Sequence, residues 1–161
     1  MKKKSVLFMT QASMIATLYV VLTVIFAPFG FSNIQVRIAE ALTILPSFTP
    51  AAIPGLFIGC IIGNLIGGSI VPDIIFGSIA TLLGAFFTYV LRNRNRYLAP
   101  LPPIISNTLI IPMILKYAYG YPLPIPLMML TVGIGEILSC GVLGIILYSA
   151  LKKYQNKIFR L

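Results

Sequence analysis

The stretch VLFMTQASMIATLYVVLTVIF, residues 6–26, contains no charged side chain. At about 1.5 Å per residue, a helix of this length reaches about 31 Å, which matches the hydrocarbon core of a bilayer. Lys2, Lys3 and Lys4 precede it, as in a signal peptide. The apolar run is longer than the hydrophobic region of a signal peptide, and no small-residue cleavage site follows it. We therefore expect residues 6–26 to form a transmembrane helix.

The composition of the whole chain is that of a membrane protein. Of its 161 residues, 58% are hydrophobic and 9% are charged, whereas soluble proteins contain about 25% charged residues. Nothing is left over for a soluble domain, so we expect residues 1–161 to form a single transmembrane domain. The net charge of +9 is compatible with nucleic-acid binding, but the basic residues flank apolar runs and are better explained as topology and headgroup signals. We expect no nucleic-acid partner.

The distribution of basic residues predicts the topology. Further predicted helices follow the first. The second is short, at about 33–45, with an apolar stretch at 38–45, and longer ones lie at about 50–70, 74–91, 104–119 and 127–151. If the N-terminus, the loop around Arg92 and the basic C-terminus are all cytoplasmic, an even number of spans precedes Arg92 and an even number follows it. Four and two satisfy this condition, so the short second helix has to cross. The sequence predicts an all-α integral membrane protein, a six-transmembrane-helix bundle with cytoplasmic N- and C-termini.

The three acidic residues of the chain lie in or beside apolar segments, and the predicted topology puts all of them in the outer half. An ionised side chain at the bilayer centre costs about 2.5 to 3.5 kcal/mol, so an acid inside the membrane indicates function. Glu136 is the sharpest case because glycines and small residues on both sides allow a close approach. The alternative is an internal pairing of Glu136 with Arg37 or Lys116. Asp73 we expect to cap the helix that starts at Ile74 rather than bind a ligand.

Polar side chains near these acids suit a planar heterocyclic ligand. Arg37 and Glu40 are three residues apart, so we expect them to share a helix face and form an ion pair in which Arg37 orients Glu40. Amide groups offer both donors and acceptors to a heterocycle, and the candidates are Asn33, Gln35, Asn64 and Asn107. The alternative for each amide is a hydrogen bond between helices.

Small residues predict close helix packing in two places. Glycines recur at every fourth position at Gly55, Gly59, Gly63 and Gly67, a GxxxG pattern that we interpret as helix packing rather than as a ligand site. Ala12 and Ala16 form a similar surface on the first helix. That surface suits a partner subunit as well as the chain's own bundle.

The sequence gives no indication of catalysis. It contains no His, and Cys60 and Cys140 lie separately in apolar runs, so we expect no metal site. A GxxxxGK[ST] nucleotide-binding loop is missing as well. We therefore expect no catalytic residues and no cofactor.

Four segments of the chain carry a resemblance to a known family: QVRIAEALTILP at 35–46, TPAAIPGLFIGC at 49–60, LAPLPP at 98–103 and VGIGE at 132–136. Together they resemble the queuosine-precursor transporter (QueT) family, and the resemblance covers nearly the whole chain. Members of this family are substrate-binding S components of energy-coupling factor (ECF) transporters. Lys116 and Pro112 depart from the family pattern. Both belong to the predicted fifth helix, so the resemblance does not define the part of the substrate site that this helix lines.

The resemblance implies a six-helix S component in a bacterial cell membrane that captures its substrate at the outer face. It also implies that Ala12 and Ala16 dock on a transmembrane coupling subunit that carries two cytoplasmic ATPases. The implied substrate is a 7-deazaguanine base, with the aminomethyl form expected and the cyano and fully modified forms open. One carboxylate would accept two donors from the base and the second would pair with the ammonium group. Which of Glu40 and Glu136 takes which part stays open.

Two hypotheses from other classes compete with this one. A stand-alone proton-coupled carrier would use Glu40 and Glu136 to exchange protons. An intramembrane enzyme has little support, because the chain has no His and no set of metal ligands, and Ser139 lacks an evident base.

Overall fold

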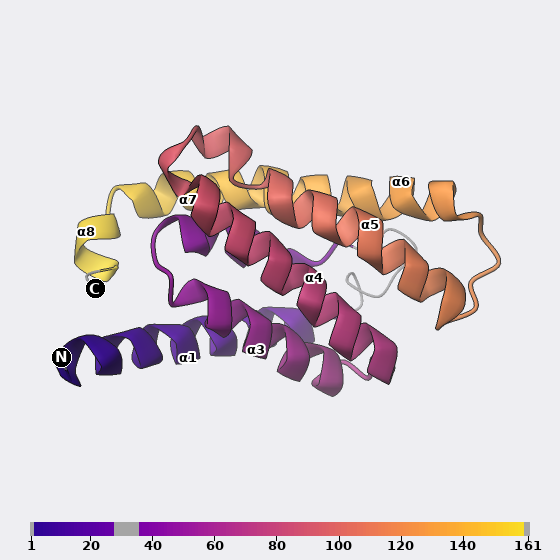
Figure 1. The fold of residues 1–161 in the computed structure, drawn as a ribbon, viewed down its shortest axis with the longest axis horizontal. Helices are drawn as coiled ribbons and strands as arrows, with labels where there is room; N and C mark the ends of the chain where they lie inside the picture. The colour runs from indigo at the N-terminus through magenta and orange to yellow at the C-terminus, as the bar shows by residue number, and fades with distance from the viewer. Residues whose placement is uncertain (1, 28–35, 160–161) are drawn as a thin grey trace.

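The structure, a computed structural model, describes residues 2–27 and 36–159. In this part of the chain every regular element is helical (Figure 1). The α-helices are α1 Lys2–Ile25, α3 Ala52–Ile66, α4 Val71–Val90, α5 Leu101–Tyr117, α6 Ile125–Glu136, α7 Gly144–Lys152 and α8 Gln155–Ile158. Short 3-10 helices are η1 Ile38–Ser47, η2 Leu91–Asn93 and η3 Arg96–Leu98. A π-helix, η4 Ile137–Leu143, joins α6 to α7 in one continuous rod.

Four helical segments of the described chain are long and apolar enough to cross a membrane, namely Lys4–Ile25, Val71–Asn93, Arg96–Tyr117 and Ile125–Lys152. The helices η1 and α3 have 10 and 15 residues. At about 2.0 and 1.5 Å per residue they reach about 20 and 22 Å, less than the hydrocarbon thickness of about 30 Å. The all-α class is therefore confirmed, together with four candidate spans. The six-span count and the orientation of the termini stay predictions.

Several helix boundaries differ from those that the sequence predicts, and two of them lie close to the acidic residues. The second helix, predicted at 33–45, is the 3-10 helix Ile38–Ser47, and residues 33–35 lie outside the described residues. The fourth helix begins at Val71 instead of Ile74. Pro72 explains the earlier start, because its fixed backbone angle and missing N–H suit the first turn of a helix.

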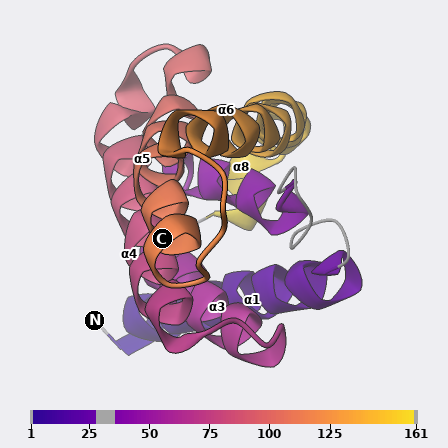
Figure 2. The same ribbon diagram turned by 90° about the vertical axis from the view of Figure 1, so that its right-hand side faces the viewer.

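The long helices form an arc around η1 (Figure 2). Along the arc α1 packs on α3, α3 on α4, α4 on α5 and α5 on α6, while η1 contacts α1, α3, α4, α7 and η4. Residues 39–46 of η1 are all buried. Glu40 therefore lies in the centre of the bundle.

The glycine pattern of α3 packs against α1, as predicted. A Cβ atom added to Gly55 would lie 2.7 Å from the carbonyl oxygen of Ala12, and one added to Gly59 would lie 2.8 Å from Cβ of Tyr19. Gly63 faces α1 in the same way, whereas Gly67 is the residue after the last turn of α3. Ala12 and Ala16 thus lie in the chain's own α1–α3 contact, with Ala16 buried and Ala12 half-buried.

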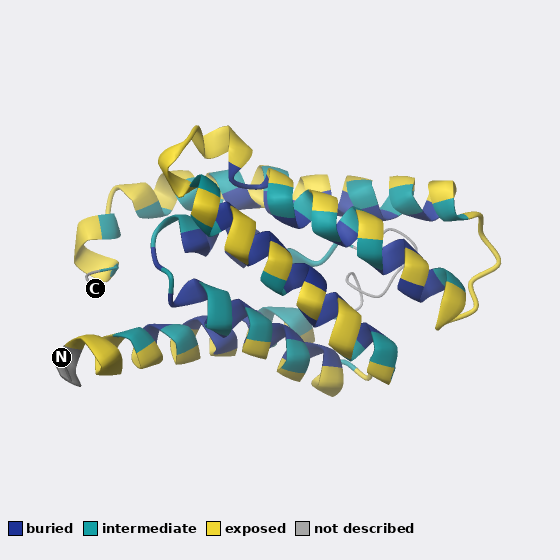
Figure 3. Cartoon of the chain, in the orientation of Figure 1, coloured by how far each residue is buried: buried dark blue, intermediate teal, exposed yellow. Residues whose placement is uncertain are grey.

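The two chain ends and the loop between α4 and α5 lie toward one end of the molecule, whereas the α3–α4 turn and the α5–α6 loop lie toward the other (Figure 1). Arg92, Arg94 and Arg96 belong to the first of these ends. The outer faces of the helices carry exposed residues along their length (Figure 3). Many are large and apolar, including Phe86, Phe87 and Ile105. Such surfaces fit contact with lipid chains.

Candidate functional site

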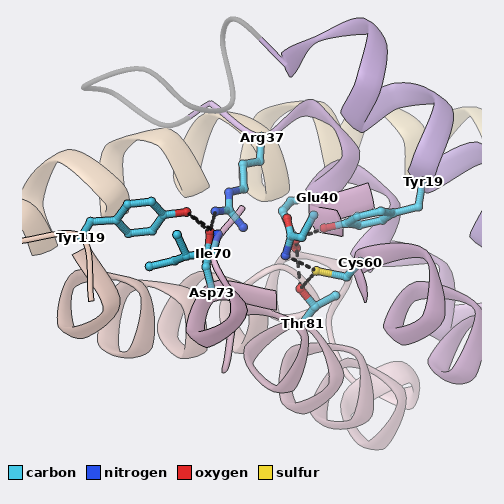
Figure 4. Close-up of polar contacts among 9 residues, drawn as sticks. Tyr19, Arg37, Glu40, Cys60, Ile70, Asp73, Thr81 and Tyr119 are labelled. Carbon is cyan, nitrogen blue, oxygen red and sulfur yellow. Dashed lines mark hydrogen bonds and ion pairs between the residues drawn. The ribbon is translucent and has the colours of Figure 1, made fainter. Parts of the chain in front are cut away.

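Glu40 is the centre of a buried polar cluster (Figure 4). Its carboxyl oxygen Oε1 accepts hydrogen bonds from the Tyr19 hydroxyl group on α1 and from the Thr81 hydroxyl group on α4, the latter at 3.0 Å. The hydroxyl of Thr81 also lies 3.5 Å from the Cys60 sulfur on α3. The other oxygen of Glu40, Oε2, is buried without a partner among the described residues. Side chains from α1, α3 and α4 thus gather around one carboxyl group of η1, and one of its oxygens has no partner in the described part of the chain.

Glu136 lies next to Glu40 in the same interior. It is the last residue of α6 and is 2% exposed. The Cys140 thiol donates to its Oε2 atom at 3.2 Å, and the Asn107 side chain on α5 lies beside its carboxyl group. One ligand atom each from Glu40, Glu136 and Cys140 lie within 4.8 Å of one another. Two buried carboxyl groups this close favour a positively charged group or a proton between them.

A second polar cluster joins Arg37, Asp73 and Tyr119. The guanidinium Nη2 of Arg37 lies 3.7 Å from Oδ2 of Asp73, and the Tyr119 hydroxyl group donates to the same oxygen at 3.1 Å. The backbone N–H of Ile70 donates to the Tyr119 oxygen at 3.4 Å. Burial and the nearby Asp73 charge raise the pKa of Tyr119, so its hydroxyl group stays protonated and remains a donor.

This cluster corrects two expectations. Asp73 does not cap α4, because the capping position is Ile70 and Asp73 lies buried in the first turn. Arg37 pairs with Asp73 rather than with Glu40. The rule for residues three apart applies inside a helix, whereas Arg37 precedes η1 with non-helical backbone angles of φ −85° and ψ 90°.

The expected alternative partners of Glu136 are engaged elsewhere. The Lys116 amine donates to the backbone carbonyl groups of Tyr121 and Leu123, at 3.4 and 3.3 Å. Arg37 is held by Asp73. Within the described residues, Glu136 therefore has no ion pair to either of them.

Several more buried polar atoms lack a hydrogen-bond partner among the described residues. They include Asp73 Oδ1, Ser78 Oγ, Asn107 Nδ2 and Ser139 Oγ, besides Glu40 Oε2. Each such atom costs about 1 to 3 kcal/mol unless a partner satisfies it. These donors and acceptors come from η1, α4, α5 and η4, the elements around the two glutamates. Their concentration in one interior is typical of a site for a polar ligand.

Space beside this cluster is small. A cavity of about 20 Å³ is lined by Tyr19, Thr23, Arg37 and Asn64 together with four apolar residues. That volume holds about one water molecule. A ligand larger than a water molecule would therefore need side chains or helices around Glu40 to move.

The structure brings together most of the predicted site residues. The carboxyl groups of Glu40 and Glu136 have atoms within 4.8 Å of each other, and Asn107 lies beside Glu136. Arg37 and Asn64 line the adjacent cavity. The amide of Asn64 reaches the Cys60 sulfur at 3.5 Å. Asn33 and Gln35, by contrast, lie outside the described residues.

Sequence reasoning missed the hydroxyl and thiol groups that complete the site. Tyr19, Thr81 and Cys140 all contact a glutamate. A signal for Thr81 was available, because Asp73, Gly77 and Thr81 recur at every fourth position and therefore share one face of α4. All three are buried.

Comparison with known proteins gives a family. No curated protein and no solved structure matches the chain significantly. A family model described as QueT transporter matches residues 9–153, from within α1 to just past the end of α7. This match agrees with the resemblance of the four sequence segments and with the apolar helices. The protein is accordingly a transport protein rather than an enzyme, and the chain belongs to the QueT transporter family.

Proposed function

We propose that this protein is the substrate-binding S component of an ECF-type ATP-driven importer and that it binds a queuosine precursor. The ligand is a 7-deazaguanine base in its aminomethyl form, held at the buried cluster of Glu40 and Glu136. The observation that carries the proposal is the convergence of these two carboxyl groups, within 4.8 Å, next to the unpartnered Asn107 amide.

The chemistry of the ligand complements this cluster. A guanine-like edge presents two adjacent N–H donors and a carbonyl oxygen, and the aminomethyl group adds a positive charge. Carboxylates accept the donors and pair with the charge, and Asn107 supplies a donor. Each hydrogen bond to a charged group contributes about 1.5 to 3 kcal/mol.

The remaining predicted site residues form the outer side of the proposed site. Arg37, which is ion-paired with Asp73, covers the site on this side, and Asn64 lines the small cavity next to Glu40. Asn33 and Gln35 belong to the proposal on their sequence position alone. Together they would surround the edge of the base that points away from the glutamates.

We further propose a location in a bacterial cell membrane, six spans and cytoplasmic termini. The common position of both chain ends and the Arg92–Arg96 loop supports this topology, because each of these regions is basic (Figure 1). The Arg37, Asp73 and Tyr119 cluster then lies near the outer face, where substrate arrives.

The proposed partners are a transmembrane coupling subunit and two cytoplasmic ATPases. The chain itself has no GxxxxGK[ST] loop, so ATP hydrolysis has to come from other subunits. Docking is proposed on α1 around Ala12 and Ala16. Since these alanines pack on α3, the partner would contact the neighbouring exposed residues Met9, Ser13 and Thr17.

A stand-alone proton-coupled carrier is the second candidate, and the proximity of Glu40 and Glu136 is the observation that favours it. Uptake in cells treated with a protonophore, with ATP maintained, separates the two. An importer driven by partner ATPases keeps its uptake, whereas a proton-coupled carrier loses it.

The direct test is identification of the ligand. The chain is purified from cells that make queuosine precursors, and the small molecule that travels with it is identified by mass spectrometry. Recovery of a 7-deazaguanine base supports the proposal. Failure of the purified protein to bind any 7-deazaguanine base in calorimetric titration would remove it.

A further inference from the structure

We infer that the two glutamates have different tasks: Glu136 and Asn107 recognise the guanine-like edge of the ligand, and Glu40 binds its ammonium group. This assignment rests on the proposed function and specifies which end of the ligand meets which carboxylate. It follows from the hydrogen bonds that each glutamate already makes.

Glu40 has one oxygen occupied and one free. A carboxylate oxygen has two lone pairs, and the hydroxyl groups of Tyr19 and Thr81 occupy both of those on Oε1. Two parallel N–H donors of a base edge need both oxygens of one carboxylate, in the way that a guanidinium group does. Glu40 therefore cannot accept such an edge without losing its hydroxyl partners. Its buried Oε2 atom is left for a single charged donor.

Glu136 is bound less firmly than Glu40 by its neighbours. Among the described residues, its Oε2 atom accepts a hydrogen bond from the Cys140 thiol, which is a weak donor. That thiol also lies 3.4 Å from the backbone carbonyl oxygen of Glu40 and 3.4 Å from the Thr43 hydroxyl group, so it has other partners when it turns away. Exchange of one weak thiol donor for two N–H donors strengthens the hydrogen bonding of this carboxylate.

Asn107 completes the match to a guanine-like edge. Its Nδ2 group is buried without an acceptor among the described residues, and its side chain lies beside the Glu136 carboxyl group. The site thus presents two acceptor oxygens next to one amide donor. A guanine-like edge presents two N–H donors next to one carbonyl oxygen, which is the complementary order.

The positive charge of the ligand fits best at Glu40. Arg37 lines the adjacent cavity, but its guanidinium group is paired with Asp73 at 3.7 Å. Glu40 is 0% exposed and keeps its free oxygen. An ammonium group next to this oxygen supplies the charge that a buried carboxylate requires.

The experiment compares two ligands on the same proteins. Calorimetric titration of the detergent-purified chain uses 7-aminomethyl-7-deazaguanine and 7-deazaguanine, which lacks the amine. We expect Glu40→Gln to weaken binding of the aminomethyl ligand by more than about tenfold and to change the affinity for 7-deazaguanine by less than about threefold. Glu136→Gln and Asn107→Leu should each weaken binding of both ligands, and within each variant the loss should be equal for the two ligands. For Glu136→Gln we expect a loss of more than about tenfold.

A second variant keeps the test valid if Glu40→Gln fails to fold. Glu40→Asp keeps the negative charge but draws the carboxylate back by one methylene group, so it should lower the preference for the aminomethyl ligand over 7-deazaguanine by about fivefold. Melting temperatures of all variants in detergent identify unfolded protein.

The outcomes separate the assignment from the proposed function. In the reverse pattern, Glu40→Gln weakens binding of both ligands and Glu136→Gln weakens binding of the aminomethyl ligand alone. This result overturns the assignment while the proposed function stands. Equal losses for both ligands in both glutamate variants have the same consequence. Wild-type protein that binds neither ligand removes the proposed function and the assignment with it.

Discussion

Replacement of Asp73 by Asn tests whether the Arg37–Asp73 pair holds α4 to the segment before η1. The substitution keeps the shape of the side chain and removes its charge. Asp73 lies in the first turn of α4 and Arg37 in the segment before η1, so the pair joins two elements that are distant in sequence. The two side chains are 11% and 4% exposed, with Arg37 the more exposed. A pair this buried loses more than a surface pair when it is broken.

The expected loss follows from the geometry. For unit charges 3.7 Å apart, Coulomb's law gives about 4.5 kcal/mol at an effective dielectric constant of about 20. Removal of one partner of a buried pair typically costs about 3 to 5 kcal/mol because the other charge stays buried. We therefore expect Asp73→Asn to lower the free energy of unfolding by about 3 kcal/mol or more. A helix cap replaced by Asn would lose almost nothing.

The assay is a double-mutant cycle on the purified protein. Free energies of unfolding are measured in mixed detergent micelles for wild type, Asp73→Asn, Arg37→Gln and the double variant. We expect a coupling energy of at least about 2 kcal/mol, because the second substitution removes the charge that the first leaves unpaired. A stability of Asp73→Asn equal to that of wild type, with no coupling, would refute the ion pair and restore the capping role.

Three other predictions concern packing, topology and docking. Gly59→Leu should destabilise the bundle by at least about 1 to 3 kcal/mol, since even a Cβ atom there would lie 2.8 Å from Cβ of Tyr19. The control is Gly133→Ala, which should unfold like wild type because its Cβ would meet nothing nearer than 3.5 Å. In a background without native cysteines, a cysteine at Asn95 should label only from inside and one at Tyr121 from outside; labelling of Asn95 from outside contradicts the topology. Thr17→Trp on the exposed face of α1 should abolish uptake and leave ligand binding nearly unchanged, and loss of both in a transport and binding assay would place Thr17 in the bundle itself.

The two glutamates are predictable from the sequence because of a general energetic rule. A carboxyl group inside a membrane is costly, so Glu40 and Glu136 stand out within their apolar segments. Both are buried and lie together. The role of Asp73 is not predictable in this way, because capping preference is a local property. Its partner Arg37 is distant in sequence, and only the tertiary fold brings the two together.

Other parts of the site could not be predicted from local pattern. Hydroxyl groups in membrane helices usually bond to the preceding turn of their own helix, as Thr17 does with Ser13. Nothing in the sequence distinguishes Tyr19, whose hydroxyl group bonds across the bundle to Glu40. Thr81 bonds to the same carboxyl group, and its sequence signal is only that it shares a face of α4 with Asp73. The 3-10 geometry of η1 is likewise a result of packing, because runs of this length are uncommon and its residues 39–46 are enclosed on all sides.

The π-helix η4 gives the rod from Ile125 to Lys152 a means of turning. Its hydrogen bonds span five residues instead of four, so the segment holds surplus chain inside an unbroken helix. A shift of the register by one residue rotates one side of the rod against the other by about 100°. Such a rotation would swing Glu136 about the rod axis while the backbone groups of the π-helix exchange one helical partner for another. This matters in lipid because no water is present to replace a lost bond. The rod could thus transmit a change at the carboxylate to its basic end at Lys152 without breaking.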